Sequence, residues 1–341
     1  MHKERLSMSE FKIDVAVIGC GYWGKNLVRN FHEIGALKAV CDFDSTTAEK
    51  FAQQYEVQAL SLQEILNSND IQAVVIAAPA AQHFNIAKQA LEKGKHVFVE
   101  KPLSLSVKEG EELCEIAKQN DLILMVGHLL HYHSAYQSLK TLVEDGTLGD
   151  LRYIYSNRLN LGKVRREEDI LWSFAPHDIS MILDLMGEEP QNVDAKGGFY
   201  LSENIADVTT THLTFSNNRK AHIFVSWLHP FKEQKLVVVG SKAMAVFIDG
   251  EPWNQKLQLY KHNIDITDET AAPLIDKADV EYVDVPESEP LKNECLHFLE
   301  SINTKAQPIT NGEEGLRVLK VLEASTSAIE KHNEQSKLLC A

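Results

Sequence analysis

Residues 13–24 read Ile13-Asp14-Val15-Ala16-Val17-Ile18-Gly19-Cys20-Gly21-Tyr22-Trp23-Gly24, and this stretch decides the fold. It begins as an apolar strand, continues into glycines spaced G-x-G-x-x-G, and opens a helical pattern. Gly19 makes the tight turn, Gly21 lets the backbone approach a pyrophosphate, and Gly24 allows helix and sheet to pack closely. The stretch therefore predicts a dinucleotide-binding turn. The alternative is a glycine-rich turn without a ligand.

A carboxylate follows the turn at the spacing of about 20 residues that dinucleotide sites use for the ribose. The apolar run Leu37–Asp42 is the next expected strand, and Asp42 lies at its end. Asp42 would accept hydrogen bonds from a ribose diol and repel a 2′-phosphate, and Phe43 and Asp44 offer no cation. We therefore expect NAD rather than NADP. The N–H groups of the helix start would hold its pyrophosphate, and the residues of the loop that contact it would be Tyr22 and Trp23.

Strands alternate with helices of about ten residues as far as Gly127, a pattern typical of βαβ units around a parallel sheet. The expected strands and helices after Asp42 cover residues 46–55, 73–77, 85–93, 96–100, 107–119 and 122–126, with a capping box at 61–64. Beyond Gly127, strands cluster and helices accompany them. Expected here are strands over 151–161, 208–215, 220–227, 236–240 and 243–248, a turn at Asn217-Asn218, and helices over 135–144, 176–186, 291–302 and 313–331. The sequence predicts an α/β domain over residues 10–127 and an α+β domain over 128–341.

Composition narrows the class of protein. The 341 residues are 44% hydrophobic and 24% charged, as expected of a folded globular chain with about two domains. With 49 acidic and 34 basic residues the formal net charge is -15, which disfavours nucleic acid as a partner. We expect no membrane span and no secretory signal. The five scattered cysteines indicate free thiols in a reducing cytoplasm.

A family resemblance becomes specific at Val97-Phe98-Val99-Glu100-Lys101-Pro102, together with Ala77-Ala78-Pro79 and His83. With these motifs the chain resembles the Gfo/Idh/MocA oxidoreductases over nearly its whole length. The resemblance implies a Rossmann domain followed by a substrate-binding and oligomerisation domain with an open-faced, mostly antiparallel sheet. It also places several residues around the cofactor: Ala78, Pro79, His83, Glu100 and Lys101.

The resemblance further implies two catalytic residues. Lys101 would lie beside the nicotinamide, and a histidine of an Asp-x-Gly-x-His motif would take the substrate proton. The corresponding stretch here is Ser173-Phe174-Ala175-Pro176-His177, so the histidine is kept as His177 while Ser173 and Ala175 depart from the pattern. This departure puts an aspartate–lysine–histidine relay in doubt, and the adjacent Asp178 cannot be assumed to replace the aspartate. Ser173 and Asp178 remain expected substrate contacts.

The residues around His177 support a base on separate grounds. We expect Pro176 and His177 in the first turn of a helix over 176–186, where the positive end of the dipole disfavours imidazolium. A neutral imidazole is what a general base needs. The alternative is a histidine that caps or packs at a helix start.

A local cluster of cations lies in residues 155–166, although the chain is acidic. Strand alternation would put Arg158 and Asn160 on one face. The loop beyond adds three cations, and arginine suits phosphate or carboxylate recognition: Lys163, Arg165 and Arg166. The alternative is a solvated loop whose cations pair with the three acids that follow it, Glu167, Glu168 and Asp169.

This segment, together with residues 171–178, resembles the branch of the family found in bacterial surface-polysaccharide pathways, including lipopolysaccharide biosynthesis. That branch includes UDP-N-acetylglucosaminuronate 3-dehydrogenases. The resemblance implies an NAD-dependent enzyme that oxidises the 3-hydroxyl of a nucleotide-linked sugar, a substrate whose diphosphate and carboxylate would use several cations. The alternatives are another sugar or cyclitol dehydrogenase, an NAD-dependent glycosidase, and a non-catalytic NAD-binding regulator.

Two further expectations concern metals and partners. His128-x-x-His131-x-His133 lacks a clear carboxylate or cysteine partner, so we expect these histidines to be structural or substrate-lining, with no metal. The resemblance implies a homo-oligomer, a dimer or tetramer, that pairs through the open sheet face. The alternation of Ala221, Ile223, Val225 and Trp227 supplies one apolar face that could equally meet the domain's own helices.

Overall fold

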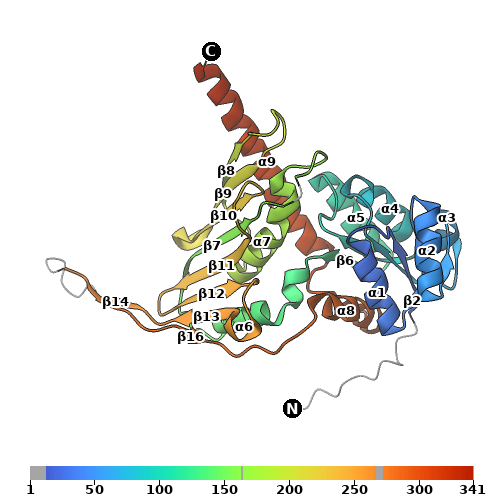
Figure 1. The fold of residues 1–341 in the computed structure, drawn as a ribbon, viewed down its shortest axis with the longest axis horizontal. Coiled ribbons are helices and arrows are strands. Elements are labelled where there is room, and N and C mark those ends of the chain that lie inside the picture. The colour runs from blue at the N-terminus through green and yellow to red at the C-terminus, as the bar shows by residue number, and fades with distance from the viewer. Residues whose placement is uncertain (1–12, 163, 266–271, 341) are drawn as a thin grey trace. The chain divides into compact units, whose positions relative to one another are not determined.

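The structure is a computed structural model that describes residues 13–162, 164–265 and 272–340. The described chain forms two compact units, coloured by residue number in Figure 1. The first contains residues 13–129 and 289–319, and the second contains residues 130–288 and 320–340.

The first unit is built on a parallel sheet of strand order β3-β2-β1-β4-β5-β6 over the described residues. The strands are β1 (Val15–Ile18), β2 (Leu37–Cys41), β3 (Gln58–Ala59), β4 (Ala73–Ile76), β5 (His96–Glu100) and β6 (Leu124–Gly127). The order reverses between β1 and β4. In open α/β sheets a reversal of this kind leaves a crevice at the carboxyl ends of the strands, where ligands bind.

Helices connect these strands and cover the parallel sheet. They are α1 (Gly24–Ile34), α2 (Ser45–Tyr55), α3 (Leu62–Asn67), α4 (Ala80–Glu92) and α5 (Val107–Gln119). Right-handed crossovers place α1 and α2 on one face and α4 and α5 on the other, because the strand order runs in opposite directions from β1 and from β4. The expected capping box at Ser61 and Glu64 is present. The prediction of a Rossmann domain is confirmed.

The chain returns to the first unit through α8 (Pro290–Thr304) and the start of α9 (Gly312–Cys340). Phe298 of α8 is fully buried, and its ring centroid lies 6.5 Å from that of Phe31 and 5.7 Å from that of Phe98. The predicted single boundary at residue 127 misses this return. Apolar periodicity identified the helix over 291–302, but periodicity alone does not say which sheet a helix covers.

The second unit is built on a mostly antiparallel sheet of strand order β16-β13-β12-β11-β7-β10-β9-β8, as expected. Only the central pair β7–β10 is parallel among the described pairs. The strands are β7 (Leu151–Leu159), β8 (Asn192–Gly198), β9 (Val208–Thr214), β10 (Lys220–Ser226), β11 (Glu233–Gly240), β12 (Met244–Ile248), β13 (Leu257–Tyr260) and β16 (Glu281–Tyr282). Of these, β8, β13 and β16 are additions to the strands expected from the sequence.

Helices cover one face of this second sheet. They are η1 (Leu129–Tyr132), α6 (Ser134–Glu144), α7 (Ile170–Met186) and the later part of α9. Two short 3₁₀ turns lie in connections between strands: η2 (Ser216–Asn218) and η3 (Trp253–Gln255). The predicted turn between β9 and β10 is confirmed, with Asn217 and Asn218 at φ 54° and 58°. Asparagine tolerates this left-handed backbone better than most residues. No helix in the described part of the chain is long and apolar enough to span a bilayer.

Strand β10 shows which face of the second sheet is apolar. Ala221, Ile223 and Val225 are buried, and β10 packs against α7, so the apolar face meets the domain's own helix. The opposite face carries His222, whose ring stacks on that of Tyr155 with centroids 5.2 Å apart. A hollow of about 630 Å³ lies on this opposite face.

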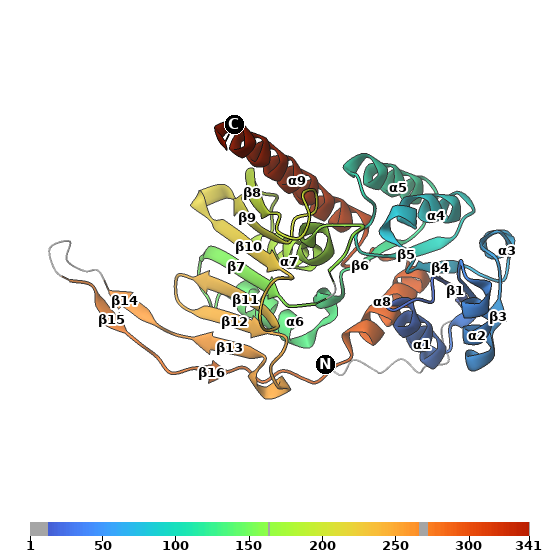
Figure 2. The ribbon, with the colours of Figure 1, turned by 45° about the horizontal axis from the view of Figure 1, so that its top comes forward.

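An arm formed by β14 (Asn263–Asp265) and β15 (Leu274–Asp276) extends beyond β13 and β16 of the second unit (Figure 2). Its exposed apolar side chains include Ile264 at 56%, Leu274 at 70% and Ile275 at 65%. The sequence analysis did not predict this arm, because three residue pairs leave little alternation to detect.

Phe298→Ala should lower the free energy of unfolding of the first unit by about 3–5 kcal/mol, since it leaves a cavity between Phe31 and Phe98. Urea denaturation of the full chain measures the change. Phe231→Ala is the control, because that side chain is 59% exposed and its removal should change stability by less than about 0.5 kcal/mol. Equal effects of the two variants would contradict the packing of α8 into the first unit.

Candidate active site

The glycine turn after β1 is held by close backbone approaches. Gly19 adopts φ +94°, and a Cβ there would lie 2.7 Å from the Ala77 carbonyl carbon. A Cβ on Gly24 would lie 1.9 Å from the Gly19 oxygen. At Gly21, in contrast, an added Cβ would meet no described atom within 4 Å. Gly19 and Gly24 are thus required by the fold itself, while Gly21 leaves open space in front of the turn.

The start of α1 is suited to an anion. Its N-cap residue, Trp23, makes no side-chain capping hydrogen bond. The first turn of a helix carries N–H groups without intrahelical partners and the positive end of the dipole. A pyrophosphate in the space before Gly21 would meet both features.

Asp42 is fixed in place just after β2. One carboxylate oxygen accepts from the Cys20 N–H at 2.7 Å and the other from the Asp44 N–H at 3.0 Å. A carboxylate has about four acceptor sites, so capacity remains for a ribose diol. Burial raises the pKa of the neighbouring Cys20 thiol to about 12, and Asp42 adds to the shift, so this thiol stays neutral.

His83 joins the two loops on the other side of the crevice within the first unit. Its side chain is 1% exposed, and its ring nitrogens lie 2.7 Å from the Pro102 oxygen and 2.8 Å from the Ala78 oxygen. His83 therefore ties the loop at Ala78-Pro79 to the loop at Lys101-Pro102. The prediction that His83 contacts the cofactor stays a prediction.

Glu100 connects the end of β5 with the glycine turn. The Trp23 indole N–H donates to its carboxylate, and Lys101 follows directly in the chain. Burial raises the pKa of Glu100 to about 7, against the lowering effects of Trp23, Lys101 and His128. Tyr22, the other aromatic residue of the loop, is 87% exposed, and the Lys25 ammonium lies 5.2 Å from its ring centroid.

In the second unit, α7 begins earlier than the sequence predicts. The Asp169 side chain caps the helix by accepting from the Trp172 N–H at 3.0 Å, so α7 starts at Ile170 and Pro176 lies inside it. His177 is therefore in the helix interior, and the argument that the helix dipole keeps it neutral is wrong. The aspartate cap outweighed the preference of proline for a first turn.

Arg158 and Asp178 bind each other in the interior of the second unit. The Arg158 Nε lies 2.6 Å from one Asp178 oxygen, and their side chains are 11% and 2% exposed. Ser156 also donates to Asp178, at 2.5 Å. Arg158 and Asp178 thus form an ion pair where α7 packs on β7, and the prediction that they contact substrate stays a prediction. Both oxygens of the Asp178 carboxylate accept hydrogen bonds from residues of β7, Ser156 and Arg158.

The rest of the cationic segment is more accessible. Arg165 is paired with Glu168 at 2.8 Å, which matches the alternative of a loop paired with its own acids, and Arg166 is exposed. Asn160 lies just past β7, and its backbone N–H donates to the backbone carbonyl oxygen of Ser226 at 3.0 Å. Two further residues were predicted to contact the substrate. Ser173 is 4% exposed within α7, and Lys163 lies outside the described residues.

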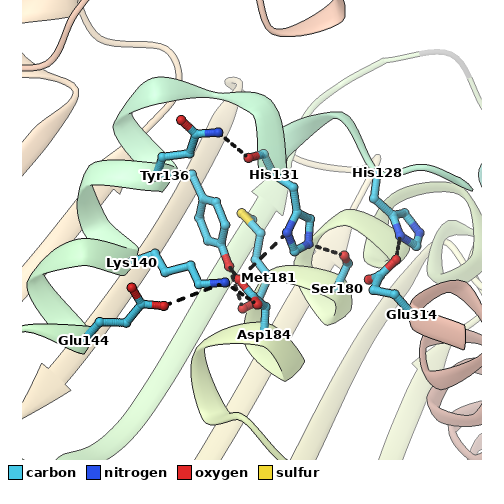
Figure 3. Close-up of polar contacts among 10 residues, drawn as sticks. His128, His131, Tyr136, Lys140, Glu144, Ser180, Met181, Asp184 and Glu314 are labelled. Atoms are coloured by element: carbon cyan, nitrogen blue, oxygen red, sulfur yellow. Dashed lines mark hydrogen bonds and ion pairs between the residues drawn. The ribbon is translucent and has the colours of Figure 1, made fainter. Parts of the chain in front are cut away.

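The three histidines of the H-x-x-H-x-H segment have different partners. His128, in the first unit, contacts Glu314 at 2.5 Å. In the second unit, His131 contacts the Ser180 hydroxyl at 2.6 Å, and Figure 3 shows it directed toward α7 near Asp184 and Tyr136. His133 accepts from the Ala135 N–H at the start of α6. Over the described residues no group of three or more His, Cys, Asp or Glu side chains is arranged to hold a metal ion.

Two family models match the chain. The model of the oxidoreductase family with an NAD-binding Rossmann fold covers residues 13–128, and the model of the GFO/IDH/MocA C-terminal domain covers residues 136–246.

Individual proteins are similar over most of the chain. UDP-N-acetylglucosamine 3-dehydrogenase of Acidithiobacillus ferrooxidans is 28% identical over 306 residues, which cover 89% of this chain and 93% of that protein. A crystal form of that enzyme superposes with a TM-score of 0.82 at 26% identity, covering 94% of this chain and 98% of that chain. The NAD⁺-dependent scyllo-inositol 2-dehydrogenase of Bacillus subtilis is 27% identical over 258 residues, covering 70% of this chain and 74% of that protein.

The parallel sheet, the glycine turn and the family match define an NAD-binding oxidoreductase. The chain belongs to the Gfo/Idh/MocA family. The first unit fits the cofactor, since Gly21 leaves space before an uncapped helix start and Asp42 retains acceptor capacity.

Gly21→Ala should fold normally but raise the Kd for NAD at least about tenfold, because its Cβ occupies the space left for the pyrophosphate. Calorimetric titration with NAD measures Kd, and thermal melting without NAD reports stability. Gly24→Ala is the matched comparison and should lower the melting temperature, since its Cβ collides with the Gly19 oxygen. NAD affinity of Gly21→Ala equal to that of the unaltered protein would contradict the assignment.

Proposed function

We propose that this oxidoreductase oxidises the 3-hydroxyl of a UDP-linked 2-acetamido sugar to a 3-keto sugar, with NAD as the hydride acceptor. The proposal rests mainly on the full-length similarity to UDP-N-acetylglucosamine 3-dehydrogenase, at a TM-score of 0.82 over 94% of this chain. Similarity over both units carries more weight than similarity over the Rossmann unit alone, because most of the residues predicted to contact the substrate lie in the second unit. A 3-keto nucleotide sugar would suit bacterial surface-polysaccharide biosynthesis.

When bound, NAD supplies the acceptor for the hydride that leaves C3 of the sugar. His177 takes the proton of the 3-hydroxyl, so the C–H and O–H bonds break as the C=O bond forms. Lys101 donates a hydrogen bond to the same oxygen and stabilises its developing negative charge. His177 is half-buried within α7, where the helix holds its backbone in place.

Two substrates differ by one carboxylate: UDP-N-acetylglucosaminuronate, predicted from the sequence, and the neutral sugar of the similar enzyme. Arg158, one of the cations that the sequence assigned to the substrate, has its charge balanced by Asp178. Arg165 and Arg166 then remain as candidate anion contacts in the described part of the cationic segment. We propose that these two arginines serve the diphosphate, which both substrates carry.

The substrate class is tested by the absorbance of reduced nicotinamide when the protein and NAD meet each candidate. We expect turnover with one or both UDP sugars and none with myo-inositol or glucose. Turnover of an uncharged comparator alone would overturn the UDP-sugar proposal.

The double variant Arg165→Ala with Arg166→Ala should raise KM at least about tenfold with little change in kcat, because uniform substrate binding is lost. An unchanged KM would remove these two arginines from the site.

His177→Asn should slow kcat by about 10²–10⁴-fold while the Kd for NAD stays unchanged, because asparagine cannot take the proton. Stopped-flow absorbance measures the rate, and calorimetric titration measures Kd. His332→Asn is the control. His332 lies on α9, is part-exposed, and pairs with Asp194 of β8. Near-normal turnover by His177→Asn would remove it as the base.

A further inference from the structure

Three exposed apolar side chains lie just outside three adjacent strands of the second unit, and the mechanism above uses none of them. Leu161 lies beyond β7, Leu228 beyond β10 and Phe231 before β11, with exposed fractions of 69%, 37% and 59%. Single exposed apolar side chains are ordinary on a protein surface, whereas a group of them indicates a binding surface. We call these three side chains the rim.

The register of the sheet places the rim residues side by side. Leu159, the last residue of β7, pairs with Ser226 of β10 and with Glu233 of β11. Each rim residue lies two positions outside one of these paired residues. At the strand spacing of about 5 Å, the row of three paired residues is about 10 Å wide, which is comparable with the length of a nucleoside.

Backbone and ring contacts fix the connections that carry the rim. Beyond β7, the Asn160 N–H donates to the Ser226 oxygen at 3.0 Å. The connection from β10 to β11 crosses the end of β7, because β7 lies between these two strands in the sheet. Within this connection the His229 ring packs edge-on against the Phe231 ring, with centroids 4.5 Å apart, and its Nδ1 lies 2.9 Å from the Phe231 oxygen.

A buried carboxylate holds the start of the same connection. Asp207 is 1% exposed, and one of its carboxylate oxygens accepts from the Trp227 indole N–H at 2.7 Å. The other accepts from the backbone N–H groups of Tyr200 and Leu201 at 2.7 and 2.8 Å. Trp227 directly precedes Leu228, so these contacts preorganise the rim, and preorganisation lowers the entropic cost of binding a ligand.

Exposed cations lie beside the rim. Lys232 directly follows the aromatic residue of the rim and forms no ion pair among the described residues. Arg165 and Arg166 lie in the loop that leaves β7, and both are exposed. That loop returns to the same end of the sheet, where the Ile170 N–H donates to the Ala206 oxygen at 3.1 Å. In a chain of net charge -15 such a group of cations favours an anionic ligand.

An aromatic ring with apolar neighbours and adjacent cations fits a nucleoside diphosphate. Aromatic side chains stack on nucleobases, and arginine and lysine bind phosphate. We propose that the rim binds the base and ribose of the nucleotide sugar, with Phe231 against the base, and that Lys232 joins the two arginines at the diphosphate. This inference rests on the proposed function, which supplies uridine diphosphate as the ligand. It assigns to the second unit the preference for a nucleotide-linked sugar over a free sugar.

The first experiment titrates uridine diphosphate and inorganic pyrophosphate into the full chain by calorimetry, with the NAD site saturated. Phe231→Ala should raise the Kd for uridine diphosphate at least about tenfold and leave the Kd for pyrophosphate unchanged, since pyrophosphate has no base to stack. Lys232→Ala should weaken the binding of both ligands. Phe231→Trp should retain the affinity of the unaltered protein. Tyr282→Ala, which removes a 51% exposed ring of β16, is the matched control.

Steady-state kinetics with the UDP sugar supply a second readout. Phe231→Ala should raise KM with little change in kcat, because the base binds equally in the ground state and the transition state. The proposal is overturned if the chain does not bind uridine diphosphate, or if Phe231→Ala binds it as tightly as the unaltered protein. Self-association lost in Phe231→Ala at unchanged nucleotide affinity would assign the rim to a second copy of this chain.

The binding assay needs no turnover, so it separates this proposal from the proposed function. If Phe231→Ala loses affinity for uridine diphosphate but the unaltered protein oxidises no UDP sugar, the rim stands and the proposed function fails. If UDP sugars are oxidised with a KM that Phe231→Ala does not change, the proposed function stands and the rim fails.

Discussion

The contact between backbones at the end of β1 is the constraint on which the first unit depends. Gly19 lies against the Ala77 carbonyl after β4, and Gly24 lies against Gly19 at the start of α1. Neither approach leaves room for a Cβ. These contacts close β1, β4 and α1 around the point where the strand order reverses, and they leave the space before Gly21 open. The cofactor site is therefore a consequence of how closely two strands and a helix can pack.

The pairing of buried charged side chains is a second constraint on both units. In the second unit, Arg158 and Asp178 pair where α7 meets β7, and Ser156 completes the carboxylate's hydrogen bonding. In the first unit, the Trp23 indole donates to Glu100, whereas neither oxygen of the buried Glu294 carboxyl has a hydrogen-bond partner among the described residues. Since an uncompensated ion is expensive in the interior, pairing decides which charged side chains remain for ligands.

Several features could be predicted from the sequence because they depend on neighbours along the chain. The glycine spacing with Asp42, the strand alternation and the turn at Asn217-Asn218 are of this kind. The start of α7 was missed although its signal was local, because Asp169 is an N-cap residue that proline at 176 obscured. Glu294 also carried a signal, an acidic residue at an apolar position of a helix, but no local pattern shows that its carboxyl group is fully buried.

The sequence by itself determined the Rossmann unit and its cofactor, since strand periodicity and glycine spacing act over a few residues. The mostly antiparallel character of the second sheet was implied by the family resemblance. Only the tertiary structure decided that α8 returns to the first unit, that His83 contacts two loops, and that Arg158 forms an ion pair with Asp178. These outcomes join residues far apart in the chain. The free energy of burying a ring or a charge depends on which partner it meets, and that partner is known only once the elements have packed.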